Sequence, residues 1–118
     1  MSSSASITLY IPCFNAKRTL AECLEGVMAQ TRPADEILVI DDGSTDGSAE
    51  IAEQLPVRVI QHEVNRGLGA ARNTALEAAG GDLVASLDAD CVPDPNWLGR
   101  LADQLEPDNV IGAGGQLV

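Results

Sequence analysis

Positively charged side chains, aromatic side chains and long apolar runs are all scarce in this sequence. Seven Lys and Arg stand against 18 Asp and Glu, which gives a formal net charge of -11. Because nucleic-acid backbones are bound mainly through Lys and Arg, this balance argues against a nucleic-acid partner. No apolar run approaches the roughly 18–20 residues that cross a bilayer, and residues 1–6 lack the basic and apolar parts of a signal peptide.

Signs of disulfide or zinc-thiolate chemistry are also missing. Cys13, Cys23 and Cys91 are odd in number and form neither a CxxC pair nor a zinc-ligand spacing, which favours a reducing, cytoplasmic location. With 45% apolar and 21% charged residues, the composition is typical of a globular protein. The 118 residues predict a single domain at 7–118 after a flexible tail at 1–6.

What the sequence does contain is a regular alternation of strand-like and helix-like segments. Apolar, β-branched runs predict strands at 7–11, 36–40, 57–60 and 83–87, and a Gly-interrupted apolar run follows at 109–118. Apolar residues at helical spacing predict a helix in each interval, ending near 28, 55, 79 and 105. This order predicts an α/β fold, a mostly parallel sheet with helices on both faces.

The expected helix starts come from capping residues. Asn15 is expected to cap the first helix, Ser44 or Thr45 the second, and Asp94, which precedes a proline, the fourth. Pro12 is expected to end the first strand, because proline has no N–H to donate to a sheet ladder.

Two carboxylates follow the fourth predicted strand at spacing i, i+2. Alternate residues of a strand share a face, so Asp88 and Asp90 are expected to point the same way, roughly 6–7 Å apart. Like charges at that distance repel, and hard divalent cations such as Mg²⁺ and Mn²⁺ bind carboxylate oxygens together with substrate phosphates. The spacing therefore favours a metal site as much as its alternative, a solvated acidic turn that helps to cap the next helix.

Polar clusters follow three of the predicted strands, at 12–15, 41–46 and 88–90. In open parallel sheets ligands bind beyond the carboxyl ends of the strands, where these clusters would meet. Three known phosphate or metal motifs do not fit. A P-loop is absent, Arg72 replaces the third glycine of a dinucleotide fingerprint that begins at Gly67, and a calcium-loop pattern at 42–53 follows a strand instead of a helix.

Five motifs in order carry a family resemblance. They are Ile-Pro-Cys-Phe-Asn at 11–15, Glu-Ile-Leu-Val-Ile-Asp-Asp-Gly-Ser-Thr-Asp at 36–46, Asn-Arg-Gly at 65–67, Ala-Arg-Asn at 71–73 and Leu-Asp-Ala-Asp at 87–90. From 7 to 118 the chain resembles the family 2 glycosyltransferases, which have the GT-A (Rossmann-like) fold. The resemblance implies transfer of a sugar from a UDP-, GDP- or TDP-sugar to a glycan or lipid acceptor, with Mg²⁺ or Mn²⁺ as cofactor.

The same resemblance assigns roles to individual residues. Asp90 matches the metal ligand of the family's Asp-x-Asp motif, and Asp88 would hold the ribose or share the ion. The other residues implied in nucleotide binding are Pro12, Phe14, Asn15, Asp41, Asp42 and Arg72. Among these, Asp42 is the better of the two carboxylates for contact with the base, and Arg72 could instead be an ordinary charge on a helix surface.

No catalytic residue is assigned in this chain, because the family's general base lies in a C-terminal half. His62 is expected to be an exposed polar residue. The apolar ending at 116–118 suggests the front half of a larger protein, inactive by itself and prone to self-association through its last strand. The intact protein could lie at the cytoplasmic face of a membrane. Two alternatives remain open, a nucleotidyltransferase-like domain and a nonenzymatic nucleotide-binding module.

Overall fold

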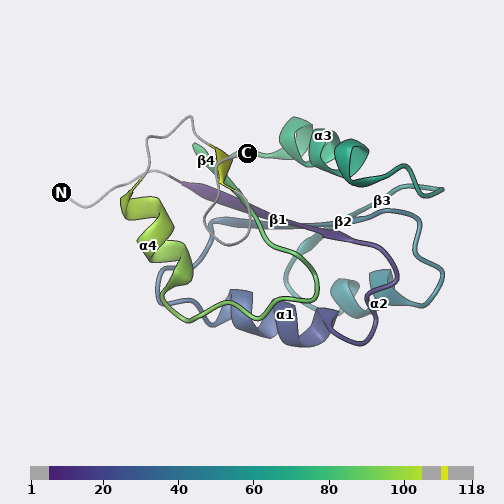
Figure 1. Cartoon of the computed structure of the whole chain (residues 1–118), viewed down its shortest axis with the longest axis horizontal. Helices are drawn as coiled ribbons and strands as arrows, with labels where there is room; N and C mark the ends of the chain where they lie inside the picture. The colour runs from purple at the N-terminus through teal and green to yellow at the C-terminus, as the bar shows by residue number, and fades with distance from the viewer. Residues whose placement is uncertain (1–5, 105–109, 112–118) are drawn as a thin grey trace.

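The computed structural model describes residues 6–104 and 110–111. Within them five parallel strands form one sheet in the order β3-β2-β1-β4-β5 (Figure 1). The strands are β1 (Ile7–Cys13), β2 (Glu36–Asp41), β3 (Arg58–Gln61), β4 (Leu83–Ser86) and β5 (Val110–Ile111). The predicted parallel α/β sheet is thus confirmed.

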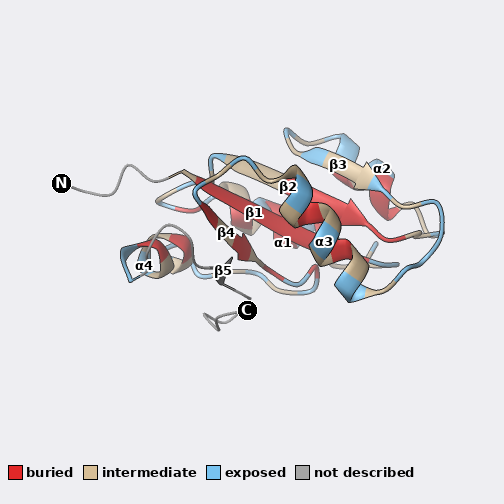
Figure 2. Ribbon diagram, turned by 90° about the horizontal axis from the view of Figure 1, so that it is seen from above, coloured by how far each residue is buried: buried red, intermediate tan, exposed pale blue. Residues whose placement is uncertain are grey.

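Helices cover both faces of the sheet, as the alternating pattern predicted. They are α1 (Leu20–Met28), α2 (Ser48–Glu53), α3 (Leu68–Ala78) and α4 (Trp97–Asp103). In Figure 1, α3 lies on one side of the strands and α1 and α2 lie on the other. This arrangement buries the central strand β1 and most of its neighbour β2, and both are red along most of their length in Figure 2.

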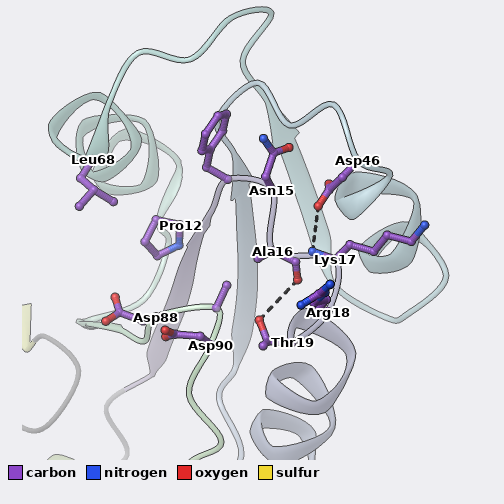
Figure 3. A pocket seen from close by; sticks show the side chains of 12 residues that line it. Pro12, Asn15, Ala16, Lys17, Arg18, Thr19, Asp46, Leu68, Asp88 and Asp90 are labelled. Atoms are coloured by element: carbon purple, nitrogen blue, oxygen red, sulfur yellow. Dashed lines mark hydrogen bonds between the residues drawn. The ribbon is translucent and has the colours of Figure 1, made fainter.

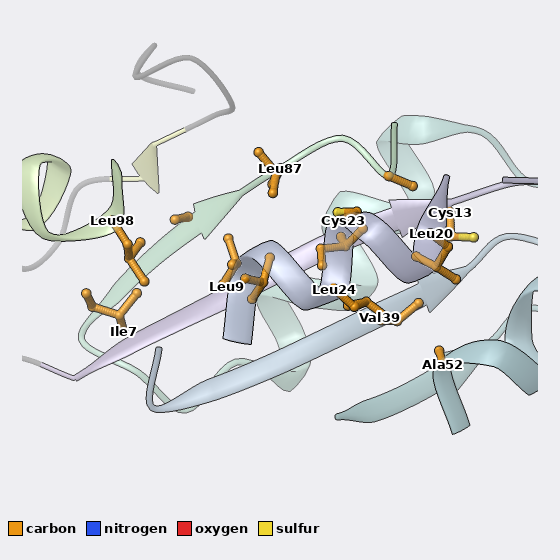
Figure 4. Close-up of a cluster of buried hydrophobic side chains, with 14 of the residues drawn as sticks. Ile7, Leu9, Cys13, Leu20, Cys23, Leu24, Val39, Ala52, Leu87 and Leu98 are labelled. Atoms are coloured by element: carbon orange, nitrogen blue, oxygen red, sulfur yellow. The ribbon is translucent and has the colours of Figure 1, made fainter. Parts of the chain in front are cut away.

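Each face of the sheet has its own apolar cluster. The larger one joins alternate residues of β1 to the inner faces of α1 and α4, and it includes Leu9, Leu24 and Leu98 (Figure 4). The smaller one packs Leu38 and Ile40 of β2, with Tyr10, against two alanines of α3. Because side chains of a strand alternate between faces, neighbouring residues of β1 serve different clusters, so a strand buried on both sides reads as a continuous apolar run.

The prediction that Pro12 ends β1 is wrong. The strand runs on to Cys13, with Pro12 in register with Ile40 of β2. Hydrogen bonds of successive strand residues point to opposite neighbours. The carbonyl of Cys13 accepts the N–H of Asp42 on the β2 side, and that of Tyr10 accepts from Leu87 on the β4 side. An N–H at position 12 would therefore face the β4 side. Because β4 ends at Ser86, its pairing with β1 stops at Tyr10, and proline at position 12 removes no hydrogen bond of that strand pair.

The predicted caps are wrong for three helices. The helices begin later, at Leu20, Ser48 and Trp97, and none has a side-chain hydrogen bond at its N-cap residue. The predicted capping side chains bind elsewhere: Asn15 bonds the loop after β2, and Asp94 accepts from the N–H of Asn96 in a short turn before α4. Each polar side chain found a backbone partner, but the partner was not the first turn of a helix.

The ends of the chain are only partly described. Ser6, assigned to the tail, exchanges hydrogen bonds with Asp82, and β5 pairs with β4 in parallel. The predicted strand at 116–118, its self-association, and most of the tail at 1–6 fall outside the described residues.

Candidate functional site

A cavity of about 670 Å³ opens at the carboxyl ends of the central strands. Two of the three predicted polar clusters, 12–15 and 88–90, meet there, and the third contributes Asp46 (Figure 3). The lining residues are Pro12, Phe14, Asn15, Ala16, Lys17, Arg18, Thr19, Asp46, Leu68, Asp88, Ala89 and Asp90. Parallel strands bring these segments together because all their carboxyl ends share one edge of the sheet.

The two aspartates predicted to bind metal lie in a turn, not on the strand. Strand β4 ends at Ser86, and the N–H of Cys91 closes the turn on the carbonyl of Asp88 at 3.0 Å. One ligand atom each of Asp88, Asp90 and Cys91 lie within 4.8 Å of one another, closer than the strand geometry predicted. Both carboxylates are exposed and line the cavity, so their oxygens are open to a cation.

Two thiols lie next to these carboxylates. Burial raises the pKa of the Cys23 thiol on α1 to about 12, and that thiol donates a hydrogen bond to the carbonyl of Asp88 at 3.6 Å. Burial, followed by the charges of Asp90 and Asp88, raises the pKa of Cys91. Cys23 is thus a neutral packing residue that ties the acidic turn to α1.

Asn15 joins the two loops that follow β1 and β2. Its backbone lies in the left-handed region, at φ 49°. Its amide oxygen accepts the N–H of Thr45 at 2.8 Å, while its own N–H donates to the hydroxyl of Ser44 at 2.8 Å. Asn favours this backbone region more than most residues do. Asn15 lines the larger cavity, and it also holds the loop opposite in place.

Asp46 extends this connection on the side of α2. Its carboxylate accepts the N–H of Lys17 at 3.0 Å and the N–H and hydroxyl of Ser48. Hydrogen bonding from the Ser48 side chain lowers the pKa of Asp46 most strongly, and the Lys17 amide adds to the effect. In Figure 3 the side chain of Lys17 extends away from the two aspartates, so its ammonium does not neutralise them.

Asp42 is buried and hydrogen-bonded to the loop after β3. Its Oδ1 lies 2.7 Å from Nδ1 of His62 and accepts the N–H of Arg66 at 2.9 Å, and its Oδ2 accepts the N–H of Gly67 at 2.8 Å. Burial alone would raise the pKa of Asp42, but the hydrogen bonds from His62 and the two amides outweigh it and lower the pKa.

The prediction that His62 is exposed is wrong. Only 5% of its side chain is accessible, and its Nε2 lies 2.8 Å from the hydroxyl of Thr74 on α3. A histidine at a strand end gives no sequence signal of such burial, because both of its partners come from other elements.

A second, smaller cavity of about 290 Å³ adjoins Asp42. It shares Pro12, Phe14 and Leu68 with the first cavity and is further lined by Cys13, Asp42, Asn65, Gly67 and Ala71. Phe14 and Leu68 are exposed apolar side chains at its margin. Lys17, Arg18, Thr19 and Leu68 line the site although sequence reasoning did not select them, because their place at the cavity depends on packing.

Two predicted site residues lie apart from these cavities. Asp41 is 2% exposed, and its Oδ1 has no hydrogen-bond partner in the described part of the chain. Arg72 lies on α3, where its Nε is buried without a partner among the described residues. Neither residue belongs to the lining of the two cavities.

No helix in the described ranges, 6–104 and 110–111, combines the length and apolar character needed to span a membrane.

Comparisons with known proteins agree with this geometry. A family model described as "Glycosyl transferase family 2" matches residues 8–118. Glycosyltransferase AglE of Haloferax volcanii is 35% identical over 118 residues, which cover 94% of this chain and 39% of that protein. The chain thus spans about two fifths of that relative.

Solved structures show the same GT-A fold. Mannosyltransferase PcManGT of Pyrobaculum calidifontis, in complex with GDP-Man and Mn²⁺, superposes with a TM-score of 0.78 and 30% identity, over 85% of this chain and 32% of that one. TarS 1-349 of S. aureus, in complex with UDP-GlcNAc, gives a TM-score of 0.76 and 31% identity, over 83% and 30%. This chain belongs to glycosyl transferase family 2.

Proposed function

We propose that the chain is the donor-binding part of an inverting glycosyltransferase. The whole enzyme would transfer a hexose from a UDP-, GDP- or TDP-sugar to a glycan or lipid acceptor. One observation carries the proposal: the carboxylates of Asp88 and Asp90 come together on the wall of the large cavity, at the edge of the sheet where ligands bind. Solved relatives with sugar nucleotides bound support the donor class.

A divalent cation fits the residues at this edge. Asp88 and Asp90 offer exposed carboxylate oxygens within 4.8 Å of each other, and hard oxygens are the ligands that Mg²⁺ and Mn²⁺ prefer. When bound, such an ion would act as a Lewis acid that stabilises the charge on a departing diphosphate. The bound Mn²⁺ of the mannosyltransferase relative supports this choice.

The nucleotide would extend from this cation toward the smaller cavity. Pro12 and Phe14 line both cavities, so they can form the apolar wall against which a base packs. Asp42 lines only the smaller cavity and would meet the base, while Asp88, which lines only the larger one, would meet the ribose or share the ion. Asn15 would hold the facing loop in place.

Asp41 and Arg72 have a weaker place in this proposal, because neither lines a cavity. Their unpartnered polar atoms, Oδ1 of Asp41 and Nε of Arg72, would need a shift of the surrounding loops to reach a nucleotide.

The general base and the acceptor site would belong to parts of the enzyme outside this chain. The chain corresponds to 39% of the AglE relative, so we expect donor binding without sugar transfer from these residues alone. The whole enzyme would act in the cytoplasm or at the cytoplasmic face of a membrane, where nucleotide sugars and lipid-linked acceptors meet.

Calorimetric titration tests this function. We expect UDP, GDP or TDP to bind with heat that requires Mn²⁺ or Mg²⁺, and we expect Asp90→Ala to abolish the metal dependence. Asp103→Asn is the matched control, because it removes an exposed carboxylate on α4, away from the cavity. Nucleotide binding that is equally tight in EDTA, or an Asp90→Ala variant that behaves like the wild type, would contradict the proposal.

A further inference from the structure

His62 connects the base end of the proposed nucleotide site to α3. We propose that His62 is a positioning residue that aligns Asp42 to select nucleobases carrying a ring N–H. The inference rests on the proposed function, because it requires a nucleotide in the cavity beside Asp42.

The three residues of this connection come from three different segments of the chain. Asp42 directly follows β2, His62 directly follows β3, and Thr74 lies in the middle of α3. Only 7% of the Asp42 side chain and 5% of the His62 side chain are accessible. Both ring nitrogens of His62 are used, at 2.7 Å from Asp42 and 2.8 Å from Thr74, so the ring has one fixed orientation.

The acceptor capacity of Asp42 is almost filled by the protein. A carboxylate offers about four lone-pair positions, and His62 Nδ1, the N–H of Arg66 and the N–H of Gly67 occupy three of them. Asp42 lines the smaller cavity, whereas His62 lies behind it, outside the lining of both cavities. The remaining acceptor position is therefore the one available to a ligand.

The ionisation of Asp42 decides which hydrogen-bonding group a ligand must present to it. Hydrogen bonding holds Asp42 as a carboxylate, with its pKa lowered. The short contact to its Oδ1 therefore needs a hydrogen on Nδ1 of His62, and Nε2 can then accept a hydrogen bond from the hydroxyl of Thr74. An ionised carboxylate accepts hydrogen bonds and donates none. Uracil, thymine and guanine present a ring N–H on their pairing edge, while cytosine and adenine present a bare ring nitrogen that the carboxylate would repel. Without the Nδ1 donor, Asp42 would lose one of the three hydrogen bonds that fix its orientation.

A purely structural role for His62 predicts a different result. If the ring only ties the loop after β3 to α3, its loss would weaken the binding of every nucleotide alike. If the ring positions Asp42, its removal would instead reduce the affinity ratio between the two bases of a pair. The affinity ratio within a matched pair, UDP against CDP or GDP against ADP, separates the two roles because each pair shares its sugar and diphosphate.

The test is calorimetry with these four nucleotides and Mn²⁺ on four variants. We expect the wild type to prefer UDP over CDP, or GDP over ADP, and His62→Leu to reduce that ratio about tenfold, which is typical of losing one charge-assisted hydrogen bond. His62→Asn, whose amide can donate to Asp42, should recover most of the ratio. Thr74→Val should reduce it less than His62→Leu, and the exposed control Glu63→Gln should leave it unchanged.

The outcomes separate the inference from the proposed function. Equal weakening of UDP and CDP in His62→Leu, or a wild type that prefers neither base, overturns the role of His62 while leaving nucleotide binding intact. A wild type that binds none of the four nucleotides overturns the proposed function and the inference with it. If His62→Leu does not fold, an unchanged ratio in Thr74→Val overturns the inference, and a reduced ratio in Thr74→Val supports it.

Discussion

The amide oxygen of Asn15 accepts the backbone N–H of Thr45 at 2.8 Å, across 30 residues of sequence. Together with the hydrogen bond from the N–H of Asn15 to the hydroxyl of Ser44, it holds the loop after β1 against the loop after β2. One side of the cavity therefore depends on a residue that sequence reasoning had assigned to a helix cap.

Asn15→Ala and Asn15→Gly separate the two contributions of this residue. Both variants lose the hydrogen bond to Thr45, worth about 1 kcal/mol, but only alanine must also adopt the left-handed backbone at φ 49°, which costs about 1 kcal/mol more. Urea unfolding should therefore show a larger loss for Asn15→Ala than for Asn15→Gly. Equal losses would mean that the backbone conformation carries no cost.

Gly43 is where the loop after β2 passes the loop after β3. Its φ is +80°, and a Cβ atom would lie 2.5 Å from the backbone nitrogen of Asn65. The left-handed φ is unfavourable for alanine, and the atom that a Cβ would meet belongs to the backbone, which cannot easily move aside. Gly43→Ala should therefore destabilise the protein by about 2–4 kcal/mol. The matched control is Gly69→Ala in the first turn of α3, where a Cβ meets nothing within 4 Å. That variant should be neutral or stabilise by up to about 1 kcal/mol. Thermal unfolding of both variants gives the comparison, and a Gly43→Ala variant as stable as Gly69→Ala would contradict the close approach.

The lowered pKa of Asp42 predicts how its contribution depends on pH. A carboxyl group with a folded-state pKa below its ordinary value of 3.8 stabilises the fold above that value and loses the contribution as pH falls through the folded pKa. Asp42→Asn should cost about 1–3 kcal/mol at pH 7, because the amide cannot accept every hydrogen bond of the carboxylate.

The measurement is the difference in unfolding free energy between wild type and Asp42→Asn as the pH is lowered from 7 to below the ordinary Asp pKa. We expect this difference to shrink in the acid range. Glu36 and Asp46, whose pKa values are also lowered, remain in both proteins, so their contributions cancel. A difference that stays constant to the acid limit would contradict the hydrogen bonding of Asp42.

Cys91 offers a soft ligand atom beside two hard ones. Its sulfur lies within 4.8 Å of a carboxylate oxygen of both Asp88 and Asp90. Thiolates bind soft cations, whereas Mg²⁺ and Mn²⁺ prefer oxygen. Cys91→Ser should therefore leave Mn²⁺ affinity within about twofold and weaken Cd²⁺ binding by about tenfold or more. Competition between Mn²⁺ and Cd²⁺, followed by the paramagnetic resonance of free Mn²⁺, provides the measurement. Equal effects on both ions would show that sulfur has no separate role.

Sequence alone determined the architecture of this protein and the edge of the sheet at which its candidate site lies. The runs that became β1, β2 and β4 are continuous and apolar because parallel strands are buried on both faces, and this property is visible locally. The polar residues at 12–15, 41–46 and 88–90 stand at or just beyond the carboxyl ends of three strands, so a parallel sheet had to bring them to one edge. The ordered motifs also identified the family, which the comparison over residues 8–118 confirms.

Tertiary structure decided which partner each polar side chain takes. Asn15, expected to cap a helix, bonds Thr45, and His62, expected to be exposed, is buried between Asp42 and Thr74. These partners lie 12 to 30 residues away, and one Asn or His offers similar hydrogen-bonding options to many backbone and side-chain groups. Periodicity records which face of an element is buried, but it carries no information about which loops meet. That meeting is set only when the sheet forms and its loops pack.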